Sequence, residues 1–265
     1  MAGTMLYCGI DVGSTMCKAL VIDGARNVLA TSMQHVGGNP DGAVDASLDA
    51  VLKVVKAKRK NLSGLLLTGR NCAQVSGKDP RESDLKCLGA GAFAIAPSTR
   101  TAIDTGSFTN KVIRLDNRGR IVDYQTNDKC AAGAGMFLEL VCKSLDLSID
   151  EIGTVALSAK KPVPVTSQCS IFAESEVIYL MNEGVSVPDI AAGACISVVG
   201  RLIPLVAKVD VEQDVILTGG VGKNVKVVQA LEEHLGMKMA TYPLDPQFVS
   251  AFGAAVIALE GANKA

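Results

Sequence analysis

Two segments of the chain repeat each other at a fixed offset of 93 residues. The segment 10–29 (IDVGSTMCKALVIDGARNVL) and the segment 103–122 (IDTGSFTNKVIRLDNRGRIV) align without a gap. The aligned positions that are identical are Ile10/Ile103, Asp11/Asp104, Gly13/Gly106, Ser14/Ser107, Lys18/Lys111 and Asp23/Asp116. Because the sequence is not of low complexity, this shared spacing favours duplicated structural units. A fold for this chain therefore has to contain the same unit twice.

Each copy predicts the same local structure. An apolar strand ends in Asp-x-Gly-Ser, and a second and a third strand follow after polar turns. Helical patterns come after each trio, at 41–59 in the first copy and from 131 to 145 in the second. Strands followed by helices predict two α/β units, each built on a mixed sheet. We expect the domains to be residues 1–97 and 98–265, with the last helix able to pack back on the first domain.

Composition excludes several classes of protein. The 265 residues carry 26 Lys+Arg against 27 Asp+Glu, and 48% are hydrophobic. The near-zero net charge gives no reason to expect nucleic acid or an anionic membrane as the main partner. The apolar stretch 190–209 is interrupted by Arg201 and Pro204 and predicts a buried helix rather than a membrane span. The first residues do not resemble a signal peptide, so we expect a cytoplasmic protein.

The repeated turns have the chemistry of a phosphate site. Glycine lets the backbone approach a ligand closely, serine hydroxyls and backbone N–H groups donate to phosphate, and aspartate can hold hydrated Mg²⁺. A single Asp-x-Gly is a weak signal, but two copies at equal spacing favour phosphate binding. A third glycine-rich turn at 217–222 lies between an apolar strand and the helical pattern 223–235, a junction that also suits a nucleotide.

The eight cysteines contain no C-x-x-C pair. They lie at positions 8, 17, 72, 87, 130, 142, 169 and 195. In a reducing cytosol a disulfide framework is not expected, and the spacing of a zinc knuckle is missing. We therefore expect most of these thiols to be small buried apolar groups.

Together the three turns resemble the motifs of the actin, sugar-kinase and heat-shock-chaperone ATPase superfamily. Two further segments point to one family within this superfamily. They are NDKCAAGAGMFLEL at 127–140 and SQCSIFAESEVI at 167–178. They resemble the signatures of the ATP-dependent activators of 2-hydroxyacyl-CoA dehydratases, a family that includes benzoyl-CoA reductase ATPase subunits and reductases of double-cubane cluster proteins. The resemblance implies two ribonuclease-H-like (actin-like ATPase) domains with a nucleotide cleft between them.

The resemblance also implies a role for two cysteines. In that family the cysteines that match Cys130 and Cys169 bind one 4Fe–4S cluster shared by the two subunits of a homodimer. Four thiolates are the usual complement of such a cluster, and two from each chain supply them. The alternative is that both are buried packing thiols.

The resemblance implies that the chain binds ATP or ADP with Mg²⁺. It also implies which residues act in catalysis and which bind the nucleotide. Catalytic carboxylates are Asp11 and Asp104. The residues matched to nucleotide binding are Gly13, Ser14, Thr15 and Lys18 in the first turn, Gly106 and Ser107 in the second, and Gly219, Gly220, Asn224 and Gln247 on the adenosine side.

The sequence also departs from the family pattern. Phe108 stands where the family commonly has a glutamine that could position the attacking water, which a phenyl ring cannot do. Met136 stands where an arginine is usual and removes a charge near the predicted cluster. The chain is therefore similar to a divergent branch of the family.

The leading hypothesis is an ATP-dependent one-electron donor to a partner iron–sulfur dehydratase or reductase, with ferredoxin or flavodoxin as its reductant. A small-molecule kinase of the same superfamily is an alternative, in which Asp104 would act as base on a substrate hydroxyl. A third hypothesis is a redox-sensing or assembly ATPase in which Phe108 makes turnover slow and the nucleotide serves as a switch.

Overall fold

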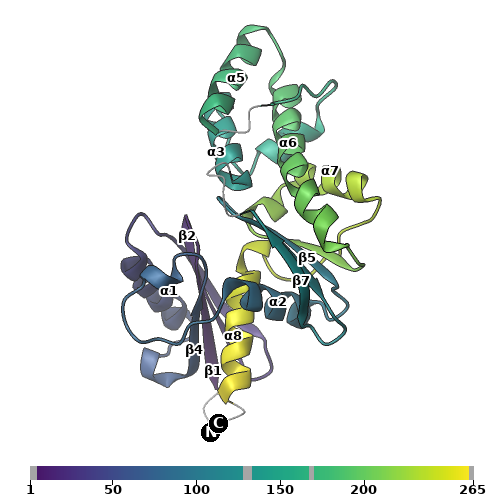
Figure 1. Ribbon diagram of the computed structural model, residues 1–265. Coiled ribbons are helices and arrows are strands. Elements are labelled where there is room, and N and C mark those ends of the chain that lie inside the picture. The colour runs from purple at the N-terminus through teal and green to yellow at the C-terminus, as the bar shows by residue number, and fades with distance from the viewer. Residues whose placement is uncertain (1–4, 128–132, 167–169, 263–265) are drawn as a thin grey trace. The chain divides into compact units, whose positions relative to one another are not determined.

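A four-stranded mixed sheet occurs twice in the computed structural model, which describes residues 5–127, 133–166 and 170–262 (Figure 1). The strand orders are β3-β2-β1-β4 and β7-β6-β5-β8, so the two sheets have the same topology. The predicted α/β fold with a duplicated unit is thereby confirmed. The chain divides into two compact units, Met1–Thr99 with Leu115–Ile121 and Tyr242–Ala265, and Arg100–Arg114 with Val122–Thr241.

The described residues of the first unit form the first sheet and three α-helices. Its strands are β1 (Leu6–Val12), β2 (Met16–Asp23), β3 (Val28–His35) and β4 (Leu62–Thr68). Its helices are α1 (Pro40–Val54), α2 (Asp84–Ile95) and α8 (Val249–Ala262). The helix predicted over 41–59 thus ends earlier, at Val54, because Lys56 takes a left-handed φ of 52° that an α-helix does not allow.

Successive side chains of β1 point to opposite faces of the sheet and pack into two separate parts of the hydrophobic core. Cys8, Ile10 and Val12 pack with residues of α1, whereas Tyr7 on the opposite face packs with residues of α8. A Cβ at Gly9 would overlap the backbone of α8, so the lack of a side chain there permits the close contact. Figure 1 shows α8 in yellow along β1 and β4.

Glycines also bring α2 and α8 into close contact. A Cβ at Gly253 would overlap the carbonyl oxygen of Cys87, and one at Gly91 would overlap the carbonyl oxygen of Val249. The two helices therefore pack backbone against backbone, and α8 is fixed in the first unit although it comes last in the chain.

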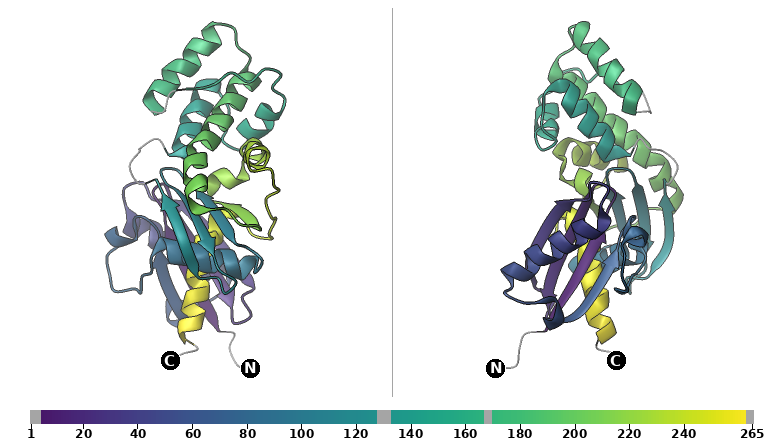
Figure 2. Two further views of the ribbon diagram at one scale, coloured as in Figure 1. Left: turned by 45° about the vertical axis from the view of Figure 1, so that its right-hand side comes forward. Right: turned by 90° about the vertical axis from the view of Figure 1, so that its left-hand side faces the viewer.

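The described residues of the second unit form the second sheet and five α-helices. Its strands are β5 (Thr101–Thr105), β6 (Asn110–Leu115), β7 (Ile121–Thr126) and β8 (Val215–Thr218). Its helices are α3 (Ala134–Leu145), α4 (Ile152–Leu157), α5 (Ser170–Asn182), α6 (Val187–Val209) and α7 (Val225–Leu235). The helix α3 begins at Ala134 rather than at the predicted residue 131, with Gly133 as its N-cap. In Figure 2 the helices α3, α5 and α6 lie together at one end of this unit.

The apolar helix α6 is part of the core of the second unit. By length and composition alone it could cross a membrane, but 61% of its apolar window is buried inside the protein. Its residues Ile190, Cys195 and Leu202 belong to the core that also includes Phe137 of α3 and Ile103 of β5. The prediction of a buried helix over this stretch is therefore confirmed.

The contact between α2 and α8 can be tested by filling one glycine. We expect Gly253→Ala to lower the free energy of unfolding by about 1–3 kcal/mol, because the added methyl forces two backbones apart. Urea denaturation followed by circular dichroism measures this change. The matched control is Gly261→Ala in the same helix, where a Cβ meets open space. The control should raise stability by up to about 1 kcal/mol, and a Gly253→Ala chain that is equally stabilised would contradict the packing argument.

Candidate functional site

The first repeated turn connects β1 and β2. Asp11 and Lys18 are cross-strand partners, and Lys18 Nζ lies 3.0 Å from Asp11 Oδ2. The turn is closed by a hydrogen bond in which Gly13 N–H donates to Met16 O at 3.1 Å. Within the described residues the hydroxyl of Ser14 makes no hydrogen bond, so it can donate to a ligand. Thr15 follows it in the turn, and its carbonyl accepts from Val36 N–H at 2.8 Å.

A second segment of the first unit supports this turn from the end of β4. Gly69 has a φ of 97°, and a Cβ there would overlap Asp11 Oδ1. Asn71 N–H donates to Val12 O at 2.9 Å, and Asn71 Nδ2 donates to Gly13 O at 3.2 Å. Sequence reasoning did not select Gly69 or Asn71 as site residues. The available signal was a glycine directly after an apolar strand parallel to β1.

The second repeated turn connects β5 and β6 with the same geometry. Asp104 and Lys111 are cross-strand partners, and Lys111 Nζ lies 3.4 Å from Asp104 Oδ2. Gly106 N–H donates to Thr109 O at 2.9 Å, as in the first turn. Lys111 was recognised only as a repeat match, and the structure places it where Lys18 lies in the first copy.

The end of β8 supports the second turn as the end of β4 supports the first. Thr218 Oγ1 donates to Asp104 Oδ1 at 2.9 Å. Gly219 has a φ of 80°, and a Cβ there would overlap Thr105 O. Each unit thus brings an aspartate, a lysine and a glycine of positive φ together at one end of its sheet.

The two aspartate–lysine pairs are partly buried. The side chains of Asp11 and Lys18 are 13% and 16% exposed, and those of Asp104 and Lys111 are 13% and 12% exposed. A carboxylate in this setting can accept hydrogen bonds from water bound to Mg²⁺, and a lysine can move to a phosphate oxygen. Together with glycine turns that offer backbone N–H groups, the pairs fit a magnesium nucleotide chemically.

The residues predicted on the adenosine side are not all brought together in one unit. Gly219 and Gly220 follow β8, and Asn224 is the N-cap of α7. The Oδ1 atom of Asn224 accepts from Lys226 N–H and Val227 N–H, both at 3.0 Å, and this cap holds the buried side chain. Gln247 lies in the first unit, where its Nε2 is 3.6 Å from Met33 Sδ.

The six cysteines among the described residues are buried free thiols, as expected. Burial raises the pKa of Cys8, Cys87 and Cys195 to about 12 and that of Cys17 and Cys142 to about 11. Such thiols are protonated at neutral pH and are poor metal ligands. No group of three or more His, Cys, Asp or Glu suited to a metal occurs among the residues that the structure describes. Cys130 and Cys169 lie outside those residues.

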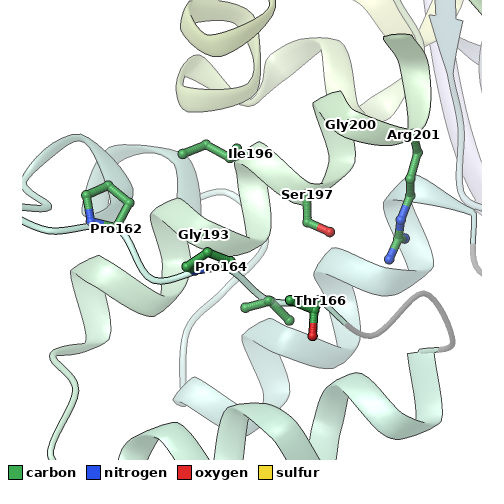
Figure 3. A pocket seen from close by; sticks show the side chains of 9 residues that line it. Pro162, Pro164, Thr166, Gly193, Ile196, Ser197, Gly200 and Arg201 are labelled. Atoms are coloured by element: carbon green, nitrogen blue, oxygen red, sulfur yellow. The ribbon is translucent and has the colours of Figure 1, made fainter. Parts of the chain in front are cut away.

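A cavity of about 410 Å³ lies in the second unit between α6 and the segment 162–166 (Figure 3). Arg201 lies at one end of it, with its guanidinium carbon 3.9 Å from the centre of the Phe137 ring. Thr166 lies at its edge and is tied to α5, because its N–H and Oγ1 donate to Glu176 Oε1 at 2.9 and 2.8 Å. Glu176 therefore fixes the position of Thr166, which directly precedes the segment 167–169 that contains Cys169.

The buried thiols predict a clear pattern of alkylation. At pH 8 a thiol with a pKa of 11 or more is ionised in about one molecule in a thousand or fewer, against about a quarter for an ordinary exposed thiol. Iodoacetamide should therefore leave Cys8, Cys17, Cys87, Cys142 and Cys195 unmodified in the native chain and modify them in urea, as measured by peptide mass spectrometry. Rapid modification of any of them in the native chain would contradict their assignment as core residues.

Comparison with known proteins identifies relatives along nearly the whole chain. The profile of the BadF/BadG/BcrA/BcrD ATPase family matches residues 8–258. The activator of lactoyl-CoA dehydratase of Anaerotignum propionicum is 37% identical over 98% of this chain and 100% of its own. The (R)-2-hydroxyglutaryl-CoA dehydratase activating ATPase of Acidaminococcus fermentans is 38% identical over 97% of this chain and 98% of its own.

Comparison with solved structures finds proteins of the same kind. Component A of the (R)-2-hydroxyglutaryl-CoA dehydratase of Acidaminococcus fermentans superposes with a TM-score of 0.91 at 36% identity, over 98% of this chain and 100% of that one. The activator of the 2-hydroxyisocaproyl-CoA dehydratase of Clostridium difficile, with bound ADPNP, superposes with a TM-score of 0.92 at 32% identity, over 98% and 96%. A glucokinase of Streptomyces griseus, at 13% identity and a TM-score of 0.59 over 97% and 100%, shows the shared fold alone.

Proposed function

Because the chain belongs to the BadF/BadG/BcrA/BcrD ATPase family, we propose that it is an ATP-dependent one-electron donor that activates a partner iron–sulfur enzyme. The partner would be a 2-hydroxyacyl-CoA dehydratase, a benzoyl-CoA reductase or a double-cubane protein. The observation that carries the proposal is the full-length likeness to ATPases that activate dehydratases. The two Asp–Lys turns of this chain have the carboxylates, lysines and backbone N–H groups that a magnesium nucleotide site needs.

The nucleotide would be ATP or ADP with Mg²⁺. We assign the first phosphate turn to Gly13, Ser14, Thr15 and Lys18, and the second to Gly106 and Ser107, with Gly219, Gly220, Asn224 and Gln247 toward the adenosine. Asp11 and Asp104 would accept hydrogen bonds from water bound to Mg²⁺. Lys18 and Lys111, which lie beside these carboxylates, would then be free to move to the negatively charged phosphate oxygens. In hydrolysis water adds to the γ-phosphorus, the bond to the leaving ADP oxygen breaks, and Asp104 orients the water in place of the glutamine that Phe108 replaces.

Cys130 and Cys169 would hold one 4Fe–4S cluster between two copies of the chain. When bound, such a cluster supplies a single electron at low potential. The described thiols support this assignment indirectly, because they are buried and protonated and do not compete as ligands. Two ligands from each chain would give the cluster its four thiolates.

A second copy of the chain is the expected neighbour of α5. This helix begins at Ser170, directly after Cys169, and it exposes large apolar side chains to solvent. Phe172 and Tyr179, seven residues apart and therefore on one face, are 68% and 61% exposed, and Ile178 is 48% exposed. An apolar helix face beside the cluster ligands supports a homodimer with its two-fold axis near the cluster. We further propose a cytoplasmic location and ferredoxin or flavodoxin as the reductant.

Removing one aspartate charge tests the nucleotide assignment. We expect Asp104→Asn to lower the rate of ATP hydrolysis about 100-fold or more, because the neutral amide can neither balance the charge of Mg²⁺ nor act as a base toward the attacking water. Phosphate release under steady-state conditions measures the rate. Asp123→Asn, on β7 of the same sheet, is the control and should hydrolyse ATP at the wild-type rate. Equal rates in wild type and Asp104→Asn would remove Asp104 from the site.

Iron analysis tests the proposed function itself. Protein purified without oxygen should contain about four iron atoms per two chains, elute as a dimer, and pass an electron to a dehydratase of the kind its relatives activate only when ATP is present. Cys130→Ser and Cys169→Ser should each abolish bound iron, whereas Cys142→Ser in the core of α3 should retain it. An iron-free monomer that phosphorylates a small molecule would overturn the proposal in favour of a kinase.

A further inference from the structure

The segment 128–132, which contains Cys130, is flanked by two sets of hydrogen bonds to the second phosphate turn. On the upstream side, Asn127 N–H donates to Asn110 O at 3.1 Å. In return, the Asn127 side chain accepts from Asn110 N–H at Oδ1, also at 3.1 Å. Asn110 is the first residue of β6, directly after the turn 106–109. The residue three positions before Cys130 is therefore fixed to the turn by its side chain.

On the downstream side, the first turn of α3 is bonded to the same four residues. Gly135 N–H donates to Gly106 O at 3.0 Å, and Met136 N–H donates to Ser107 O at 3.1 Å. A Cβ at Gly133 would overlap Ser107 O and the Cα of Phe108, so this close contact requires glycine. Two otherwise unsatisfied N–H groups of the helix N-terminus are thus satisfied by the phosphate turn rather than by a capping side chain.

The hairpin beneath this turn contains buried polar groups without partners. Thr105 and Asn110 are paired across the strands and both are fully buried. The Thr105 hydroxyl and the Asn110 carboxamide have no hydrogen-bond partner within the described part of the chain. Because unpaired buried polar groups cost free energy, a second arrangement of the turn that pairs them would recover part of that cost. Two such arrangements are what a switch requires.

We propose that Asn127 is a positioning residue that transmits the nucleotide state of the second phosphate turn to the segment containing Cys130. A shift of the turn on binding or losing the γ-phosphate moves Asn110 and the carbonyls of Gly106 and Ser107 together. Asn127 and the α3 N-terminus follow, because both are hydrogen-bonded to those groups. The inference rests on the proposed function only in requiring that a nucleotide binds at this turn.

The test compares four full-length chains: wild type, Asn127→Ala, Asn127→Asp and Gln125→Ala. The aspartate keeps an oxygen that can accept from Asn110 N–H, so it should rescue the alanine variant. Gln125 lies two residues earlier, on β7, and its side chain forms no hydrogen bond within the described residues, so Gln125→Ala is the matched control. In iron-free protein, the rate of Cys130 alkylation is measured by peptide mass spectrometry with Mg-ADP and with Mg-ADPNP. Nucleotide affinity is measured in parallel by calorimetry.

We expect the two nucleotides to change the alkylation rate of Cys130 by about fivefold or more in wild type, Gln125→Ala and Asn127→Asp. In Asn127→Ala the ratio should fall toward one while nucleotide affinity is kept. In iron-loaded protein, the electron paramagnetic resonance spectrum of the reduced state should lose its nucleotide dependence in the same variant.

The inference is overturned by a wild-type ratio near one with nucleotide bound, or by an unchanged ratio in Asn127→Ala. Loss of nucleotide affinity in Asn127→Ala would also overturn it, because the residue would then act in binding. A wild-type chain that binds nucleotide and shows the ratio but takes up no iron would support the inference while refuting the proposed electron donor.

Discussion

The structure of both candidate turns depends on one cross-strand pair, an aspartate opposite a lysine at the tip of an antiparallel hairpin. Strand pairing fixes the register, and a slip of one residue would place the lysine on the opposite face of the sheet. The neighbouring parallel strand then ends in a glycine of positive φ, Gly69 or Gly219, which leaves room for the hairpin. Every other element of the site is arranged around this pair, which is why the same three parts recur in both units.

The two copies differ in what lies against the turn. In the first unit the side chain of Asn71 supports the turn, and this contact comes from a segment without a predicted ligand. In the second unit the support comes from Asn127 and the N-terminus of α3, which flank the segment containing Cys130. The two repeated turns thus share an Asp–Lys pair and a glycine of positive φ, and they differ in that the described supports of the second turn flank the segment containing Cys130.

The repeat in the sequence was sufficient to predict three strands of each sheet, the duplication of the unit and the positions of both aspartates, because these follow from local patterns of apolar and turn residues; β4 was not predicted. The repeat did not predict which residues from distant parts of the chain hydrogen-bond to the two turns. Thr218 lies 114 residues from Asp104 along the chain, and no local pattern reports such a contact. The start of α3 was predicted three residues early because the two alanines at 131 and 132 have a high helix propensity, whereas the contact of Gly133 with the second repeated turn makes that glycine the N-cap.

The carboxylate of Asp104 has both oxygens occupied in this structure, and the two partners are not equivalent. Thr218 Oγ1 donates to Oδ1 at 2.9 Å, whereas Lys111 Nζ is 3.4 Å from Oδ2. The lysine carries a charge and a flexible stem, so a phosphate can draw it away, whereas the buried Thr218 hydroxyl is closer to Asp104 Oδ1, at 2.9 Å, than to its other acceptor, Ile103 O, at 3.4 Å. Exchange of Lys111 for a nucleotide would therefore free Oδ2 and leave the carboxylate oriented by Thr218. In the hydrolysis that we propose, Phe108 offers no polar group to the attacking water, and a carboxylate released in this way would be the group in the second turn best suited to orient it.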